Sequence, residues 1–133
     1  MKYLLDTDIC IFLLRGDTAI ADRINSAGFS NCAISEITKA ELLTGLHYAE
    51  RKGRNLNEDK LLEFLDAITV IPVTNGIERY AREKARLIYE GQRIEDFDLL
   101  IGCTAVSGSM VMVTNNTAHF ERIDDIILEN WKE

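Results

Sequence analysis

Three carboxylates interrupt apolar sequence at points where chemistry could be built. Asp6 follows the apolar run 3–5, Glu41 lies inside an apolar helical pattern, and Asp98 directly precedes the apolar stretch 99–106. A carboxylate near a protein core must be paired, hydrogen-bonded or bound to a metal, because burying it alone is costly. Carboxylate oxygens favour Mg²⁺ or Mn²⁺, and such an ion can activate a water and neutralise charge on a phosphodiester. If the fold brings the three acids together, they predict a metal site.

Each of these acids also has a purely structural interpretation. Asp6 and Asp98 could cap the helices that follow them, and Glu41 could lie at a solvated edge. Asp8 and Asp96 are expected to be helix caps. The prediction therefore depends on the pattern, because three acids at the starts of separate α/β units can converge on one edge of a sheet.

Other catalytic patterns are missing from the sequence. It contains no G-x-S-x-G, no Walker loop, no G-x-G-x-x-G and no H-E-x-x-H. Its two histidines, His47 and His119, are expected in surface or structural positions, and metal-assisted hydrolysis requires neither. Asn115 and Asn116 follow a predicted strand, where they are first a turn and capping signal and only second candidates for the metal site.

Strands and helices alternate along the chain, which predicts an α/β protein with a mostly parallel sheet. Right-handed crossovers then place the polar residues that follow the strands, Asp6, Ser35 and 114–116, at one edge. Pro72 suggests that the third strand lies at the edge of the sheet or ends there. The predicted strands are 1–5, 32–34, 69–73, 110–113 and 126–128. The predicted helices are 9–14, 17–25, 35–52, 58–67, 75–90 and 99–106.

Composition is that of an ordinary globular protein. The 133 residues, 47% of them hydrophobic, are expected to form a single domain, residues 1–133. With no signal-peptide pattern and no run of roughly 20 apolar residues, we expect a cytoplasmic protein that does not enter a membrane.

Cys10, Cys32 and Cys103 lack metal or disulfide spacing and are expected to be buried thiols. The net charge of −7 by itself argues against nucleic-acid binding, although a metal site needs carboxylates.

Basic residues gather on one predicted helix. Arg79, Arg82 and Arg86 share a flank, with Lys84 and Arg93 nearby. They could form a solvated face paired with the glutamates of the same helix. Alternatively they form a rim that contacts phosphates, with Arg86 supporting the substrate.

Four segments together resemble one family. The segments 5–9, 38–42, 96–101 and 113–116 have the order and spacing of PIN domains, and more narrowly of VapC-type toxins from type II toxin–antitoxin pairs. The resemblance covers the whole chain. It implies a three-layer α/β/α fold around a mostly parallel sheet of four or five strands. It also implies a Mg²⁺-dependent endoribonuclease, with Mn²⁺ as an alternative ion, that cleaves RNA, often tRNA, with a metal-activated water.

The resemblance also assigns residues and partners. Asp6 and Asp98 would be metal ligands, and Glu41 would complete the site directly or through a water. Thr7 and Thr114 would support the site. Asn116 stands where many PIN domains have a fourth acid, which weakens the case for a second metal ion. A homodimer and a VapB-like antitoxin that occludes the site are expected.

Two other classes of function remain open at this point. The sequence Asp6-Thr7-Asp8 resembles the start of a haloacid-dehalogenase-type phosphatase, in which the first aspartate is the nucleophile and the second the acid/base. However, Cys10 stands where that family has a small hydroxyl or branched residue. A receiver-like signalling domain, or a PIN domain that binds without turnover, would use the same acids without catalysis.

Overall fold

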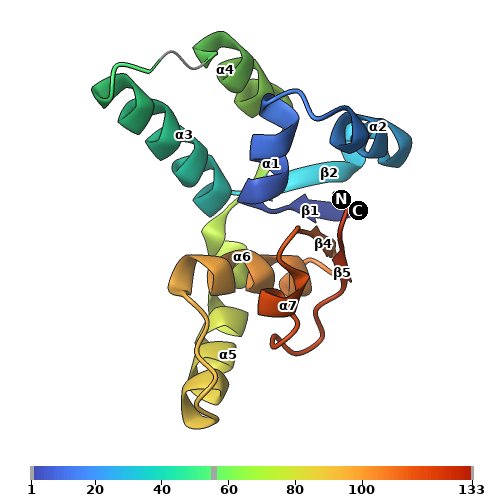
Figure 1. The fold of residues 1–133 in the computed structure, drawn as a ribbon. Coiled ribbons are helices and arrows are strands. Elements are labelled where there is room, and N and C mark those ends of the chain that lie inside the picture. The colour runs from blue at the N-terminus through green and yellow to red at the C-terminus, as the bar shows by residue number, and fades with distance from the viewer. Residues whose placement is uncertain (1, 55–56, 133) are drawn as a thin grey trace.

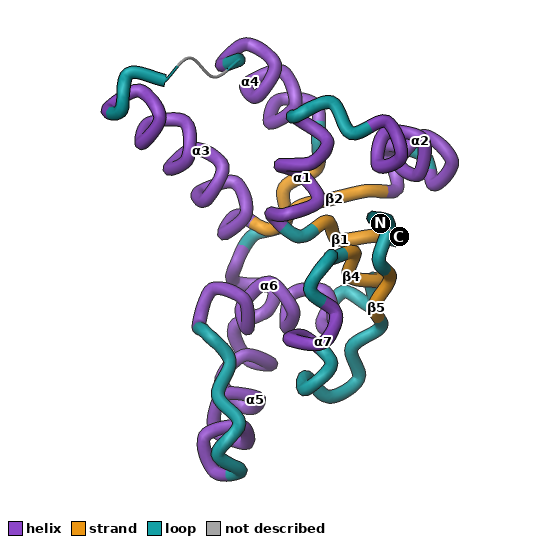
Figure 2. The backbone as a smooth tube through the Cα atoms, in the orientation of Figure 1, coloured by secondary structure: helices purple, strands orange, loops and turns teal. Residues whose placement is uncertain are grey.

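A five-stranded parallel sheet forms the centre of the protein in the computed structural model, which describes residues 2–54 and 57–132. The strand order is β3-β2-β1-β4-β5, and all four strand pairs are parallel. The three-layer α/β/α architecture predicted from the sequence is confirmed, with the strands gathered between two groups of helices (Figures 1 and 2). The strands are β1 Tyr3–Leu5, β2 Cys32–Ser35, β3 Thr69–Ile71, β4 Val111–Val113 and β5 Leu128–Glu129.

The helices divide between the two faces of the sheet. In Figure 1, α1 to α4 lie on one side, and α5, α6 and α7 lie on the other. Two short 3₁₀ turns connect helices to strands: Phe29–Asn31 lies between α2 and β2, and Val73–Gly76 lies between β3 and α5. The helices are α1 Thr7–Leu14, α2 Thr18–Ala27, α3 Glu36–Arg51, α4 Glu58–Ala67, α5 Ile77–Tyr89, α6 Asp96–Ser107 and α7 Thr117–Phe120.

Each face of the sheet has its own apolar core, because the side chains along each strand point alternately to the two faces. Leu5 and Ile34 accordingly belong to the core under α1 to α4, whereas Leu4 and Ala33 belong to the core under α5 and α6. The apolar helix α6 has six buried residues, as expected for a helix that is hydrophobic on most sides.

Several predictions about local structure are confirmed. Helices α3 and α4 begin at the predicted caps, Ser35 and Asn57, whose side chains accept backbone N–H groups. Strand β3 lies at the edge of the sheet, as Pro72 suggested. The three cysteines are free and buried. Within residues 2–54 and 57–132, no helix is long and apolar enough to cross a membrane.

Other boundaries differ from the prediction. Asp6, not Asp8, caps α1, so the helix starts two residues earlier than expected. Glu95 caps α6, which places Asp96 and Asp98 inside its first turn. The last strand is 128–129 instead of 126–128, and the four-residue helix α7 was not predicted. The first strand begins at Tyr3, and Met1 lies outside the described residues.

The order of the strands creates a switch point. From β1 the chain moves outward through β2 and β3, and it then returns to pair β4 against the other side of β1. Ligands of open α/β sheets bind beyond the carboxyl ends of the strands where the order reverses. Asp6 and Thr114 directly follow the two strands that meet there, and the Asp6 N–H donates to the carbonyl of Val113 at 2.8 Å.

Candidate metal centre

Asp6 is the most deeply buried of the three predicted metal ligands, with 7% of its surface exposed. Its Oδ1 accepts the N–H of Thr7 at 2.8 Å, which caps α1, and its Oδ2 accepts the hydroxyl of Thr114 at 2.8 Å. Burial first, and then the charge of Asp8, raise the pKa of Asp6 to about 7 despite these two hydrogen bonds. Asp6 is therefore both a helix cap and a carboxylate that is costly to ionise.

Glu41 is joined to the same helix start by a threonine. It lies on α3, half-buried, and its Oε1 is 2.7 Å from the hydroxyl of Thr7. The Thr7 hydroxyl is also 3.0 Å from that of Thr38. Because a hydroxyl has one hydrogen, Thr7 donates to Glu41 and accepts from Thr38. Burial, followed by the charges of Asp98 and Glu95, raises the pKa of Glu41.

Asp98 reaches the site from the first turn of α6. Its Oδ2 lies 3.1 Å from Nε2 of His119, while its backbone N–H donates to the side chain of Glu95 at 3.4 Å. Burial is the largest cause of its raised pKa, and the charge of Glu95 adds to it, while His119 opposes the rise.

These three carboxylates, here called the acidic cluster (Asp6, Glu41 and Asp98), interact electrostatically. The charge of Asp98 raises the pKa of both Asp6 and Glu41. In the part of the chain that the structure describes, no lysine or arginine lies within ion-pair distance of any of the three. Among the described residues, the fold thus collects negative charge from the end of β1, from α3 and from α6 without placing a lysine or arginine beside it.

The cluster is looser than the sequence predicted. Among residues 2–54 and 57–132, no three His, Cys, Asp or Glu side chains are arranged to hold a metal ion as they stand. Direct ligation by three carboxylates is therefore not preformed. Mg²⁺ typically uses one or two carboxylates and completes its shell with waters, so the hard oxygen donors present still fit that ion.

Asp8 has a different environment from its neighbour Asp6. Its Oδ1 accepts the N–H of Ile9 at 2.7 Å, and its Oδ2 accepts the N–H of Asn115 at 3.0 Å. Oδ1 thus bonds within the first turn of α1, and Oδ2 ties that turn to the segment after β4. This structural role argues against the phosphatase alternative, in which Asp8 would exchange a proton with the substrate.

The segment after β4 supports the site mainly through its backbone. The hydroxyl of Thr114 donates to Asp6 and accepts the backbone N–H of Asn116 at 3.0 Å. Asn116 itself is exposed, and its side chain does not cap α7. The structure thus places Thr7 and Thr114 in direct contact with the acidic cluster, whereas only the backbone of Asn116 takes part.

Arg86 does not join this set. Its guanidinium donates to Glu83, Glu90 and the carbonyl of Arg122, and it lies 3.2 Å from a carboxylate oxygen of Asp124. The contacts with Arg122 and Asp124 hold α5 against the segment after α7, and those with Glu83 and Glu90 lie within α5 and its C-cap. They argue against the predicted contact of Arg86 with substrate.

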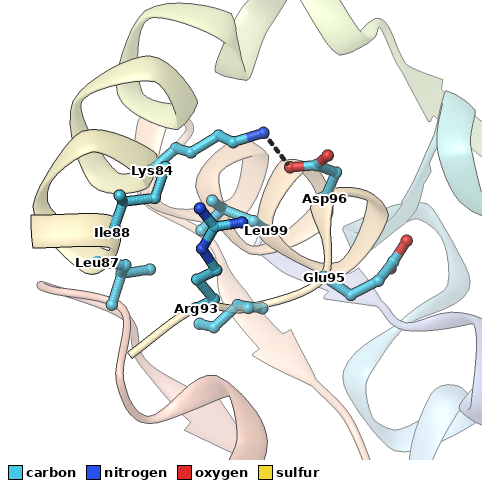
Figure 3. Close-up of a pocket in the computed structure, with 8 residues that line it drawn as sticks. Lys84, Leu87, Ile88, Arg93, Glu95, Asp96 and Leu99 are labelled. Carbon is cyan, nitrogen blue, oxygen red and sulfur yellow. Dashed lines mark hydrogen bonds and ion pairs between the residues drawn. The ribbon is translucent and has the colours of Figure 1, made fainter. Parts of the chain in front are cut away.

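The rest of the basic flank is paired in the same way. Arg79 pairs with Asp125, Arg82 with Glu78, and Lys84 with Asp96. The pairs of Arg82 and Arg86 with glutamates of the same helix agree with the structural interpretation of the flank, whereas Arg79 and Lys84 pair with aspartates outside α5. Figure 3 shows that Lys84 and Asp96 are in direct contact where they line a pocket of about 280 Å³ between α5 and α6.

Glu95 and His119 were missed by the sequence interpretation, although both act on the acidic cluster. In Figure 3, Glu95 points away from the pocket that Arg93 enters, and its charge raises the pKa of Glu41 and Asp98. The acidic run 95–98 could have indicated Glu95 as a cap. Nothing in the sequence pairs His119 with Asp98, which is 21 residues away.

Comparisons with known proteins agree with the fold. A family model described as PIN domain matches residues 3–126. The tRNA(fMet)-specific endonuclease VapC of Shigella flexneri is 32% identical, and ribonuclease VapC2 of Rickettsia felis is 34% identical; each alignment covers 98% of both chains.

Solved structures give the same result. A chain of the Rickettsia felis VapBC2 complex with promoter DNA has a TM-score of 0.86 and 32% identity, covering 98% of this chain and 99% of that one. A chain of the DNA-bound VapBC complex of Salmonella typhimurium has a TM-score of 0.82 and 31% identity, covering 98% of both. Matches of this extent and identity establish the family. The chain belongs to the PIN-domain family and, within it, to the VapC ribonucleases.

Proposed function

We propose that this protein is a divalent-metal-dependent endoribonuclease, the toxin of a type II toxin–antitoxin pair, and that it cleaves tRNA. The observation that carries the proposal is the acidic cluster, whose carboxylates have raised pKa values and no lysine or arginine partner among the described residues. The identity to VapC ribonucleases over almost the whole chain supports the reaction class. The tRNA(fMet) specificity of one such relative supports the substrate.

Mg²⁺ is the proposed ion, with Mn²⁺ as a substitute, because the cluster offers only hard oxygen donors. Asp6 and Asp98 would hold the ion, and Glu41 would complete the site directly or through a water. When bound, the ion neutralises charge on a phosphodiester and lowers the pKa of water. Thr114 holds Asp6, and Thr7 holds Glu41, so that both carboxylates keep their positions when the site binds RNA.

A VapB-like antitoxin is the proposed partner, in line with the VapBC complexes among the similar structures. A pocket of about 280 Å³ between α1, α3 and α4 suits a peptide segment from such a partner. Apolar residues such as Ile11, Leu42 and Leu46 line it, and Glu41 lies in its wall. A segment with apolar side chains and one basic residue could fill the pocket and reach the acidic cluster, which would block RNA.

A homodimer acting in the cytoplasm, where tRNA is found, completes the proposal. The end of α5 and the start of α6 expose large apolar side chains, with Tyr89 93% exposed and Phe97 48% exposed. Exposed apolar area of this kind is typical of association surfaces. The mass of the purified protein by light scattering tests the dimer, and a monomer at micromolar concentration would contradict it.

The decisive experiment is a digestion of total RNA by the purified protein, freed of antitoxin, followed by sequencing of the cleaved ends. With Mg²⁺ we expect cuts in tRNA that leave 5′-phosphate and 3′-hydroxyl ends. Asp6→Asn and Asp98→Asn should each lower the cleavage rate by at least ~10³-fold, since each removes a carboxylate that would hold the ion. Asp22→Asn, which changes an exposed carboxylate of α2, is the matched control and should cleave at the wild-type rate.

Two results would refute the proposal. One is full activity of Asp98→Asn, and the other is undiminished cleavage in excess EDTA. Cuts confined to messenger or ribosomal RNA would leave the ribonuclease in place but remove tRNA as its substrate.

A further inference from the structure

His119 connects Asp98 of the acidic cluster to Arg122, which lies in the segment after α7. His119 lies in α7, and its Nε2 is 3.1 Å from Oδ2 of Asp98. Its other ring nitrogen, Nδ1, is 3.2 Å from Nη2 of Arg122. The imidazole ring also packs edge-on against Phe120, with ring centres 5.2 Å apart. Both nitrogens of the ring are therefore engaged, and its orientation is fixed.

Arg122 decides which nitrogen carries the hydrogen. A guanidinium can only donate hydrogen bonds, so Nδ1 of His119 must accept. The neutral imidazole then carries its single hydrogen on Nε2, the atom that faces Asp98, and the carboxylate accepts it. Arg122 is itself held, because its Nη1 donates to the carbonyl of Arg93 at 2.9 Å and its Nε to the carbonyl of His119 at 3.4 Å.

The chain of hydrogen bonds ends on one oxygen of Asp98. No residue that the structure describes forms a hydrogen bond with the other oxygen, Oδ1. A carboxylate with one oxygen anchored keeps its plane and presents the second oxygen in a defined direction. Partners of this kind orient metal ligands in proteins, and their loss typically lowers metal affinity by about 10–100-fold.

We propose that His119 is a positioning residue for the metal site: its Nε2–H anchors Oδ2 of Asp98 and leaves Oδ1 for the divalent cation, and Arg122 fixes the required tautomer. The inference rests on the proposed function, because it gives Asp98 the role of a ligand. His119 itself neither contacts the ion nor exchanges a proton with RNA.

A purely structural role for His119 predicts different behaviour. Helix α7 is anchored by Phe120, which is 1% exposed, and the chain after it by Ile123, which is 2% exposed. These apolar contacts do not need the imidazole. If His119 served only to pack α7, its replacement would change the stability of the protein but leave its affinity for a metal ion unchanged.

Two replacements of His119 separate these roles. His119→Gln can place an amide N–H near the position of Nε2, whereas His119→Leu has similar bulk and no donor. Binding of Mn²⁺ to the full-length protein is measured by isothermal titration calorimetry. We expect the dissociation constant to rise about 10-fold or more for His119→Leu and to stay within about threefold of wild type for His119→Gln.

Arg122→Met provides an independent variant. Without the guanidinium, the hydrogen can move to Nδ1, so we expect a smaller rise, about three- to tenfold, in the dissociation constant for Mn²⁺. Thermal unfolding in EDTA shows that each variant is folded, and His119→Leu and His119→Gln should have similar melting temperatures.

The results separate the inference from the proposed function. Wild-type affinity for Mn²⁺ in a folded His119→Leu protein would overturn the role of His119 and leave the ribonuclease untouched. Equal losses in His119→Leu and His119→Gln would also overturn it, because the donor would then not matter. If the wild-type protein binds no Mn²⁺ and cleaves no RNA, the proposed function fails, and the inference fails with it.

Discussion

Asp6→Asn should make the protein more stable at neutral pH while abolishing its activity. The pKa of Asp6 is raised to about 7 from an ordinary 3.8, first by burial and then by the charge of Asp8. Between these two values the folded protein holds a proton that the unfolded chain has lost. The free energy of unfolding therefore falls as the pH rises from 3.8 to about 7, and above this range the ionised carboxylate destabilises the folded protein.

The pKa difference gives the size of the effect. Each unit of pKa difference between the folded and unfolded states corresponds to about 1.36 kcal/mol of stability. The rise in the pKa of Asp6 from 3.8 to about 7 therefore costs at most ~4 kcal/mol. Asparagine keeps an acceptor for the N–H of Thr7, but it loses the second acceptor that receives the hydroxyl of Thr114. A lost hydrogen bond costs about 1 kcal/mol, so we expect a net gain of about 2–3 kcal/mol at pH 8.

Urea unfolding followed by circular dichroism at pH 4, 6 and 8, in EDTA, measures the free energy of unfolding for both proteins. The advantage of Asp6→Asn should be largest at pH 8 and should be lost near pH 4, because at a pH close to the ordinary pKa of 3.8 the folded and unfolded states differ little in bound protons. Asp22→Asn is the control and should show no such dependence. Equal or lower stability of Asp6→Asn at pH 8, or an advantage that persists unchanged to pH 4, would refute the conclusion that Asp6 is a buried carboxylate with a raised pKa.

Three further substitutions test one contact of the site and two ion pairs of α5. Thr114→Val removes the hydroxyl that lowers the pKa of Asp6, so Asp6 should titrate at still higher pH; NMR titration of the carboxyl carbon checks this, and an unchanged pKa would contradict it. Arg86→Met leaves the carboxylate of Glu83, which is 4% exposed, without its partner, and should cost about 1–3 kcal/mol at pH 7 in urea unfolding. Because the pKa of Glu83 is lowered, this loss should shrink as the pH falls below 4.5. Arg82→Met breaks only an exposed pair and should change stability by less than about 0.5 kcal/mol, and a loss equal to that of Arg86→Met would contradict the assignment.

The elements of the fold were determined largely by local sequence. Apolar periodicity and caps such as Ser35 and Asn57 predicted most helices correctly, because both signals act within a few residues. The position of Asp6 after a strand and before a helix was predictable for the same reason. Boundaries were wrong where neighbouring acids competed for the same role, as at Glu95, which caps α6 in place of Asp96 or Asp98.

Only the tertiary structure decided how the site is held. The hydrogen bond from Thr114 to Asp6 joins residues 108 positions apart, and that from Thr7 to Glu41 spans 34. These contacts depend on β1 lying beside β4 and on α3 following β2, which is a property of strand order and not of local pattern. The sequence marked the three acids, but the packing of the elements set their pKa values and paired Asp98 with His119.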